Sequence, residues 1–219
     1  MSQMQKDVFL STEGDEWYKR NASKLSEDKP ELHLFKKFVK PGNKVLEIGC
    51  ASGDVSRFFS SLKASYVGID PSSQAIHKAK ETQSSGEFLV GTSDSLPFED
   101  DSFDFVYFGF CLYLVDPKLL TRTVAEADRV LKNQGFLAYL DFDVKYPQSR
   151  GYAHSPHIQT RKMDFSNLFL GFPQFTLAHK SIFSHNSHLD TPFEENPQER
   201  TTVSVIYKNL QQGYFHEGK

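Results

Sequence analysis

Two glycines and a later carboxylate give the first chemical signal in this sequence. The apolar run 45–48 continues into the segment Gly-Cys-Ala-Ser-Gly. In this segment Gly49 and Gly53 bracket a turn that leads into a predicted helix. Glycine lets the backbone turn sharply and approach a ligand without side-chain interference. Asp70 ends the next apolar run, where a carboxylate can bind the ribose hydroxyls of a nucleotide. The spacing therefore predicts a cofactor that contains a nucleoside.

The turn differs from the glycine pattern that holds a dinucleotide pyrophosphate. That pattern is G-x-G-x-x-G, with the phosphate at the N-terminus of the following helix. Here the small residues Gly49, Ala51 and Gly53 fall at every second position. Asp54 would also place a negative charge where the phosphate would bind. The turn therefore favours a cationic or neutral cofactor and argues against a nicotinamide oxidoreductase.

The elements that must position these residues alternate along the chain. Predicted strands at 45–48, 64–69, 87–91, 103–110 and 136–143 accompany predicted helices at 54–62, at 71–82, and from Pro117 to a stop at Gly135. This alternation predicts an α/β fold with a parallel sheet covered on both faces. Two further strands, at 175–184 and 201–210, predict an antiparallel pair at the sheet edge. We expect a Rossmann-like three-layer sandwich with a seven-stranded, mostly parallel sheet.

The chain of 219 residues shows no linker, so we predict a single domain with four segments. Residues 1–40 form an N-terminal helical cap, with two helices in 13–40 of which Asp28 and Pro30 introduce the second. Residues 41–143 form the cofactor-binding core. Residues 144–174 form an irregular insertion over the substrate, and residues 175–219 form the edge hairpin and tail. We expect the cap to act as a lid over the ligand end of the sheet.

Composition limits the partners. The formal net charge of -3 provides no basic field for nucleic acid, so a small-molecule acceptor is favoured. The start of the chain lacks a secretory signal and no stretch has the length of a membrane span, which predicts a cytoplasmic protein without a membrane partner. Cys50 and Cys111 have neither disulfide nor metal-pair spacing, and no metal is expected. The oligomeric state, monomer or dimer, stays open.

Four segments, in order, resemble class I S-adenosylmethionine-dependent methyltransferases of the methyltransferase-11-like group. The first is the turn segment EIGCASG that begins at Glu47. The others are VGIDPSSQAI at 67–76, SDSLPFEDDSFDFVYF at 93–108 and RVLKNQGFLAYLD at 129–141. Because they appear in the family's order across about residues 41–143, the resemblance is more specific than any single glycine motif.

The resemblance implies S-adenosyl-L-methionine as the cofactor, with S-adenosyl-L-homocysteine as the product. It implies that Glu47 orients the turn and reaches the methionine amino group, and that Asp70 accepts hydrogen bonds from both ribose hydroxyls. Thr92 stands where the family's usual adenine-binding acid would be. The other cofactor-binding predictions are the turn residues Gly49, Cys50, Ala51 and Gly53, then Pro71, with Ser93 and Asp94 near adenine and Phe108 and Gly109 beside the methionine.

Methyl transfer is an in-line displacement, so the protein mainly aligns the reactants and adds a base where the acceptor must lose a proton. Many relatives carry a paired histidine after the fourth strand, and here Tyr113 is the nearest polar group, which predicts that it faces the substrate. His154 and His157 could be general bases, metal ligands or ordinary loop residues. A metal is the least supported of these, because no third ligand stands at a recognisable spacing.

Four more residues are predicted to contact the substrate. Trp17 and Arg20 share one helix face, which suits a lid over cofactor and acceptor. Arg161, with Lys162 beside it, could hold an anionic acceptor. Asp141 lies at the carboxyl end of the fifth predicted strand and points toward the expected active site.

The leading hypothesis is therefore S-adenosylmethionine-dependent methyl transfer to a small molecule, with O-methylation of a hydroxyl as one option. Methylation of RNA or protein is the second hypothesis, and it would require a basic groove that the sequence does not suggest. A non-catalytic protein that binds S-adenosylmethionine is the third. The missing histidine pair and Thr92 give this third hypothesis some support.

Overall fold

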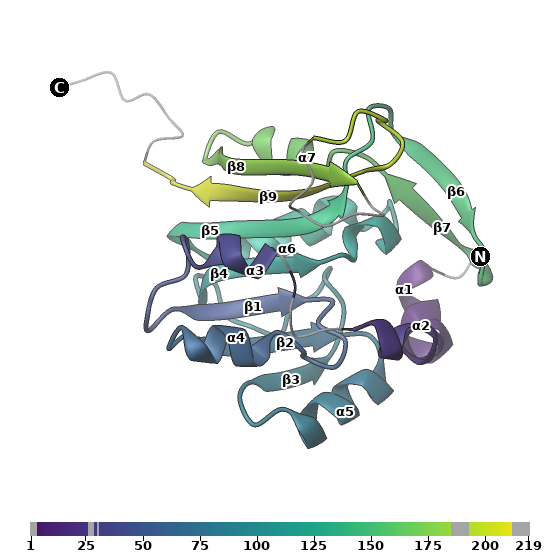
Figure 1. Ribbon diagram of the computed structural model, residues 1–219, viewed down its shortest axis with the longest axis horizontal. Helices are drawn as coiled ribbons and strands as arrows, with labels where there is room; N and C mark the ends of the chain where they lie inside the picture. Colours follow the sequence, from purple (N-terminus) through teal and green to yellow (C-terminus); the bar gives the residue numbers. More distant parts are fainter. Residues whose placement is uncertain (1–3, 26–28, 30, 185–192, 212–219) are drawn as a thin grey trace.

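The computed structural model describes residues 4–25, 29, 31–184 and 193–211, and a seven-stranded sheet forms its centre (Figure 1). The strand order is β3-β2-β1-β4-β5-β9-β8. The strands are β1 (Lys44–Ile48), β2 (Ser65–Asp70), β3 (Glu87–Val90), β4 (Phe103–Gly109), β5 (Leu131–Phe142), β8 (Phe175–Ser184) and β9 (Arg200–Lys208). The first five run parallel, and β9 runs antiparallel to both β5 and β8. The predicted sheet with its antiparallel edge pair is confirmed.

Helices cover both faces of the sheet. One face carries α3 (Glu31–Phe35), α4 (Ser56–Ser61) and α5 (Ser73–Thr82), and the other carries α6 (Leu120–Val130) and α7 (Ser166–Leu170). Each face has its own hydrophobic core. In β1, Val45 packs in the core beneath α3, α4 and α5, whereas Leu46 and Ile48 pack in the core beneath α6 and α7. This alternation follows from the two-residue period of a strand, and burial on both faces explains why the strands are apolar throughout.

The strand order reverses between β1 and β4, and this position fixes where a ligand can bind. From β1 the sheet continues to β2 and β3 on one side and to β4 and β5 on the other. The parallel strands all end at the edge that faces α1 (Gln5–Val8) and α2 (Gly14–Asn21) (Figure 1). In open α/β sheets the crevice beyond this reversal is the usual ligand site.

The predicted helix stop at Gly135 is wrong. Helix α6 ends at Val130, and β5 begins at the next residue. Gln134 has a φ of 65°, and a Cβ added to Gly135 would come within 2.9 Å of the Lys132 carbonyl oxygen. The pairing of β4 with β5 also shifts register between Phe103 and Phe105. The glycine therefore marks an irregularity inside a strand, which a sequence pattern does not distinguish from a helix stop.

The segment 144–174 is more regular than predicted. It forms a hairpin of β6 (Gln148–Tyr152) and β7 (Ser155–Lys162), followed by α7. The paired register breaks between Gly151 and Tyr152, and Pro156 lies inside that break. Because an irregular stretch tolerates a residue without an N–H group, the proline does not prevent the hairpin. The hairpin extends from the sheet edge toward α1 (Figure 1).

The N-terminal cap also differs from its prediction. Its first helix begins at Gln5 rather than at residue 13, and a π-helical turn at Phe9–Glu13 joins α1 to α2. The second predicted helix, α3, does not cover the ligand end, because Phe35 packs against Phe105 and Tyr107 on the sheet face at ring-centroid distances of 5.1 and 4.9 Å. Asp28 and Pro30 lie outside the described residues. Within the described part of the chain, every helix is too short or too polar to cross a membrane.

Candidate functional site

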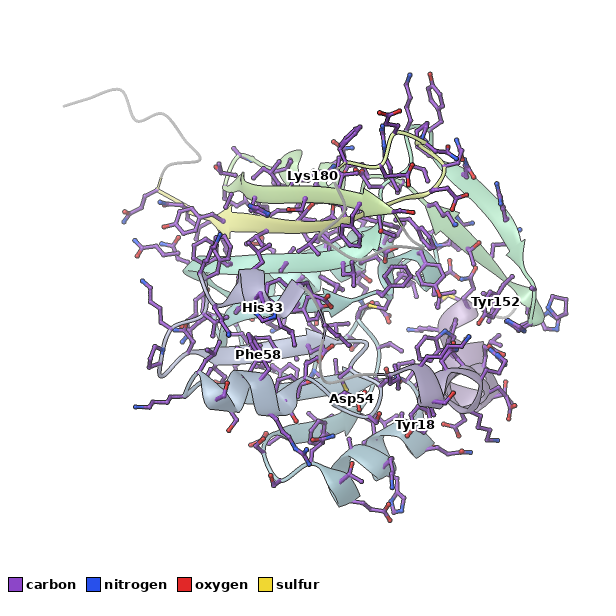
Figure 2. The ribbon with its side chains drawn as sticks, in the orientation of Figure 1. Tyr18, His33, Asp54, Phe58, Tyr152 and Lys180 are labelled. Atoms are coloured by element: carbon purple, nitrogen blue, oxygen red, sulfur yellow. The ribbon has the colours of Figure 1, made fainter. Side chains whose placement is uncertain are left out.

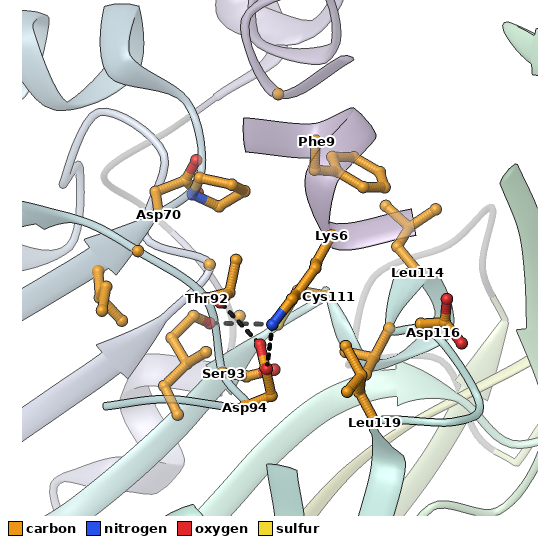
Figure 3. A pocket seen from close by; sticks show the side chains of 18 of the residues that line it. Lys6, Phe9, Asp70, Thr92, Ser93, Asp94, Cys111, Leu114, Asp116 and Leu119 are labelled. Atoms are coloured by element: carbon orange, nitrogen blue, oxygen red, sulfur yellow. Dashed lines mark hydrogen bonds and ion pairs between the residues drawn. The ribbon is translucent and has the colours of Figure 1, made fainter. Parts of the chain in front are cut away.

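A pocket lies where the parallel strands end, beneath α1 and α2 (Figure 3). This is the usual place for a ligand in an open α/β sheet. Its walls come from three chain regions that the fold brings together. They are the cap residues Lys6, Phe9, Gly14 and Trp17, the strand ends around Gly49, Asp70, Gly91 and Gly109, and the segment 110–119 that follows β4.

The glycine turn forms one wall of the pocket, and Gly49 is the turn residue that lines it. Gly49 has a φ of 80°, and a Cβ added there would lie 2.8 Å from the Cβ of Cys111. The N–H groups of Gly49 and Cys50 both donate to the Ile69 carbonyl oxygen, at 2.8 and 3.2 Å, which fixes the turn on β2. The position therefore requires glycine for both its conformation and its space. Cys50, Ala51 and Gly53 support the turn from behind and do not line the pocket.

Asp70 lines the pocket at the end of β2, as Pro71 does directly after it. Its Oδ2 accepts the Ala51 N–H at 2.9 Å, and its Oδ1 accepts the Ser72 N–H at 2.8 Å. Burial raises the pKa of Asp70 to about 6, although these two backbone hydrogen bonds oppose the shift. A carboxylate can accept about four hydrogen bonds, so each oxygen keeps capacity for a ligand hydroxyl. The geometry suits a fixed acceptor for a diol.

Glu47 lies immediately behind this wall. Its side chain is buried, and the Tyr66 hydroxyl donates a hydrogen bond to Oε2. Its Oε1 faces Gly109, because a Cβ added to Gly109 would come within 2.7 Å of that oxygen. Burial raises the pKa of Glu47 to about 7, against the opposing effects of Lys29 and Tyr66. The carboxyl is thus separated from the pocket by little more than a glycine backbone.

The part of the pocket next to the end of β3 contains an ion pair that the sequence did not suggest. Lys6 Nζ of α1 lies 2.8 Å from Asp94 Oδ2, and the Thr92 hydroxyl donates to Asp94 Oδ1 at 2.7 Å (Figure 3). Burial disfavours the charge of Asp94, but the hydrogen bonds from Lys6 and Thr92 outweigh it, so its pKa is lowered. The hydroxyl of Ser93, also in the pocket wall, bonds to that of Thr123 at 2.9 Å.

At the end of β4 the side chains divide between core and pocket. Phe108 is fully buried in the core beneath α7, with its ring centroid 6.3 Å from that of Phe169. It was predicted to contact the cofactor, but it does not line the pocket. Gly109 does line it, together with Phe110 and Cys111. Phe110 has a φ of 57°, a conformation that bulky residues rarely adopt and that clusters at functional sites.

Comparison with known proteins relates the central part of this chain to methyltransferases. Residues 46–139 match the family model described as a methyltransferase domain. Among curated proteins, an uncharacterized methyltransferase of Synechocystis sp. is 31% identical over 111 residues, which is 51% of this chain and 52% of that protein. A demethylmenaquinone methyltransferase of Thermotoga maritima is 33% identical over 128 residues, 57% of this chain and 49% of that protein. The chain thus spans about half the length of these relatives.

Solved structures extend the likeness of the fold beyond the matched core. A SAM-dependent methyltransferase from Methanosarcina mazei has a TM-score of 0.65 and 22% identity, and the alignment covers 85% of this chain and 100% of that one. A putative methyltransferase of Haloferax volcanii, solved in complex with the Trm112 methyltransferase activator, has a TM-score of 0.66 and 21% identity, with 93% and 97% covered. Residues 46–139 thus match a methyltransferase domain, and most of the chain shares its fold with these solved structures.

Two residues predicted to face the substrate instead support the pocket wall. Asp141 is fully buried, its Oδ2 accepting the Tyr113 N–H at 3.2 Å and its Oδ1 the Phe142 N–H at 2.7 Å. Burial raises the pKa of Asp141 to about 7. The Tyr113 ring packs edge-on against those of Phe110 and Phe142, at centroid distances of 5.4 and 5.3 Å, and does not line the pocket. The carboxyl therefore anchors the segment after β4.

The structure separates the two predicted cap residues. Trp17 lines the pocket. Arg20 instead binds Glu13 within the cap and donates to the Tyr152 hydroxyl of the β6–β7 hairpin at 3.2 Å. Figure 2 shows Tyr152 at the end of the hairpin nearest α2. Arg20 therefore joins the cap to the hairpin.

The three predicted residues of the hairpin do not line the pocket. His154 and His157 are exposed, and the His154 ring packs against Tyr152 at 5.2 Å. Arg161 donates from Nη2 to the Gln159 side chain at 3.2 Å. The regular hairpin places these side chains away from the strand ends, whereas the prediction assumed an irregular loop folded over the substrate. Among the described residues no group of three or more His, Cys, Asp and Glu could hold a metal ion.

Several pocket residues escaped the sequence analysis, among them Lys6, Phe9 and Phe110. Lys6 and Phe9 precede the helices predicted in 13–40, and their apolar and charged neighbours resemble an ordinary surface helix. Phe110 lay within a predicted buried strand, so its role as a wall was hidden. The sequence signal that could have found Phe110 is its position directly after Gly109, where β4 must end.

Proposed function

We propose that this chain transfers a methyl group from S-adenosylmethionine to a small-molecule acceptor. The observation that carries the proposal is Asp70, a carboxylate at the pocket held by two backbone N–H groups, one of which belongs to the glycine turn. Asp70 would bind the ribose diol, and the bare backbone at Gly49 would allow the close approach of the cofactor. When bound, the cofactor supplies an electrophilic methyl group on a positively charged sulfur.

The chain's own residues have three tasks in this proposal. Glu47, behind Gly109, would attract the cationic amino group of the methionine part, and the Tyr66 hydroxyl fixes the orientation of its carboxyl. The cap residues Phe9 and Trp17 would exclude water above the pocket. Alignment and exclusion of water are the main requirements of an in-line displacement, so no covalent nucleophile is needed.

We propose a small and largely apolar acceptor. Phe9, Trp17, Phe110 and Leu114 supply the apolar part of the walls. Several matched relatives are named demethylmenaquinone methyltransferases, and such a name supports a small-molecule acceptor for this chain. We also propose, from the sequence, O-methylation of a hydroxyl and a cytoplasmic location. The net charge of -3 disfavours RNA as the acceptor.

Titration calorimetry with S-adenosylhomocysteine and a methyl-transfer assay on extracted metabolites test the proposal together. We expect saturable 1:1 binding in the wild type, its loss in Asp70→Ala, and release of S-adenosylhomocysteine over many turnovers. Binding without turnover on any metabolite fraction would favour the non-catalytic alternative. Retention on RNA that weakens steeply with salt would instead favour a nucleic-acid acceptor. Absence of binding in the wild type contradicts the proposal.

A further inference from the structure

The helical cap, defined here as residues 5–24, is joined to the rest of the domain by several polar contacts. Besides Arg20, which reaches Tyr152, three of its side chains contact residues far away in the sequence. Asp15 bonds to Ser72, Ser73 and the Gln74 N–H, Gln5 bonds to the main chain of Leu114 and Gln159, and Lys6 pairs with Asp94. These contacts close the cap over the strand ends.

The contact between Lys6 and Asp94 differs from the others. Both of its partners line the pocket, whereas Asp15, Gln5 and Arg20 do not. The Lys6 side chain enters the pocket from α1 and ends at the carboxylate, at the end where adenine is expected (Figure 3). The Asp94 side chain is 2% exposed and that of Lys6 is 28% exposed. The pair is therefore part of both the cap and the cofactor pocket.

Loss of Lys6 would leave Asp94 in an unfavourable state. The carboxylate is almost fully buried, and among the described residues Thr92 would be its remaining side-chain donor. A buried charge that loses its partner is strongly destabilised, and water must enter to restore its solvation. Because the cap covers this end of the pocket, water reaches Asp94 most easily when the cap opens.

We propose that Lys6 is a positioning residue whose ion pair with Asp94 holds the helical cap closed over the cofactor pocket, so that cap closure and cofactor binding are coupled. This rests on the proposed function, because the ligand that closure favours is S-adenosylmethionine or S-adenosylhomocysteine. Coupling is reciprocal, so a ligand that binds the closed form better must in turn stabilise the closed cap. Weakening the ion pair should therefore lower the affinity for the ligand.

The chain carries its own reporter of cap position. Trp17 is the single tryptophan of the sequence, it belongs to the cap, and it lines the pocket. Acrylamide quenching of its fluorescence therefore measures exposure of the cap's inner face. The test compares the wild type, Lys6→Met, Asp94→Asn and the double variant, each with and without S-adenosylhomocysteine. Lys19→Met is the matched control, because Lys19 is a cap lysine that pairs with Glu16 on the exposed side.

We expect Lys6→Met to raise the quenching constant of the ligand-free protein. We also expect it to lower the affinity for S-adenosylhomocysteine about tenfold, as measured by titration calorimetry. Lys19→Met should change the affinity less than about twofold, as exposed pairs contribute little. The double variant should bind better than the product of the two single effects predicts, because it removes the unpaired carboxylate as well as the pair. Saturating ligand should return the quenching of Lys6→Met to the wild-type value.

Quenching and affinity in Lys6→Met that match those of Lys19→Met would overturn the proposal. So would additive effects in the double variant. These outcomes are separable from failure of the proposed function. If the wild type binds no S-adenosylhomocysteine, the proposed function fails, and the ligand-free quenching comparison still decides whether Lys6 holds the cap. Thermal unfolding of each variant, followed by circular dichroism, confirms that the compared proteins are folded.

Discussion

The two sides of the pocket are built in different ways. The cofactor side consists of the glycine turn and Asp70, whose hydrogen-bond partners are main-chain groups of the adjoining turns. The cap side is held by hydrogen bonds between distant segments. Lys6 donates to Asp94 over 88 positions, and the Gln5 N–H donates to the Asp116 carboxylate over 111. The first side is rigid because the sheet determines it, and the second depends on a few long-range contacts.

This difference separates two kinds of specificity. A cofactor common to a family can be bound by main-chain geometry, which changes little when side chains change. An acceptor that differs between relatives requires walls that can vary, and the cap and the β6–β7 hairpin both lie outside the matched residues 46–139. We therefore expect substitutions on the cofactor side to affect ligand binding most, and substitutions on the cap side to have smaller effects.

The largest expected effect is that of Asp70→Ala. It removes two charge-assisted backbone hydrogen bonds and both proposed contacts to ribose, so we expect S-adenosylhomocysteine to bind roughly 100-fold more weakly or worse. Titration calorimetry measures the change. Asp70→Asn is the control, because it keeps the shape and one acceptor oxygen and should lose less. Wild-type affinity in Asp70→Ala would place the cofactor elsewhere.

Gly49→Ala tests whether the turn is rigid through crowding as well as through conformation. Gly42 is a matched control, since its φ of 84° is similar to the 80° of Gly49 and a Cβ added to Gly42 meets nothing within 4 Å. We expect Gly42→Ala to cost about 1 kcal/mol and Gly49→Ala about 2 kcal/mol more, because its methyl group overlaps Cys111. Chemical denaturation measures both. Equal losses would contradict the crowding.

The raised pKa of Asp70 predicts a dependence of binding on pH. With a pKa of about 6 the group is mostly neutral at pH 5, and a neutral carboxyl cannot accept two diol hydrogen bonds in the same way. We expect affinity for S-adenosylhomocysteine to fall about tenfold from pH 7 to pH 5. Asp70→Asn should remove this dependence, and a flat wild-type profile would contradict it.

The same shift acts on stability with the opposite sign. The pKa of Asp70 in the fold, about 6, lies above the ordinary value near 4, so the folded state holds the proton more tightly. Its contribution to the free energy of unfolding is complete at low pH and is lost as the pH rises through about 6. Chemical denaturation without ligand at pH 5 and pH 7, in the wild type and in Asp70→Asn, isolates this contribution.

Asp15→Ala should have a moderate effect confined to the cap. Asp15 accepts hydrogen bonds from Ser72, Ser73 and the Gln74 N–H at the start of α5, and loss of such contacts at a helix start costs about 1 kcal/mol. We expect increased quenching of Trp17 with a cofactor affinity reduced only a few-fold. Asp7→Ala, an exposed change on the same cap, should leave both unchanged. A loss as large as that of Asp70→Ala would remove the distinction between the two sides.

The smallest effect is expected from His154→Ala. The side chain is exposed at the hairpin and lies outside the pocket, so we expect the rate of methyl transfer to change less than about twofold. Steady-state kinetics with the identified acceptor measures it. A large fall in kcat would restore the general-base role that the sequence suggested and would require the hairpin to move over the pocket.

The sequence by itself determined the sheet, the glycine turn and Asp70. Each depends on neighbours a few positions away, or on the rule that parallel strands end at one edge, so apolar runs and turn residues were enough to predict them. Even there, the direction of single side chains escaped prediction. Phe108 and Asp141 face the interior, because one of two alternating faces had to be chosen without knowledge of the helices that cover them.

Only the tertiary structure decided the cap side of the pocket. No local pattern connects Lys6 with Asp94 or Arg20 with Tyr152, since each pair forms only after the sheet has brought distant segments together. The β6–β7 hairpin was hidden for a related reason, because Pro156 and a register break obscure its alternation. Short-range geometry is encoded in adjacent residues, whereas contacts between distant segments depend on the arrangement of the whole fold.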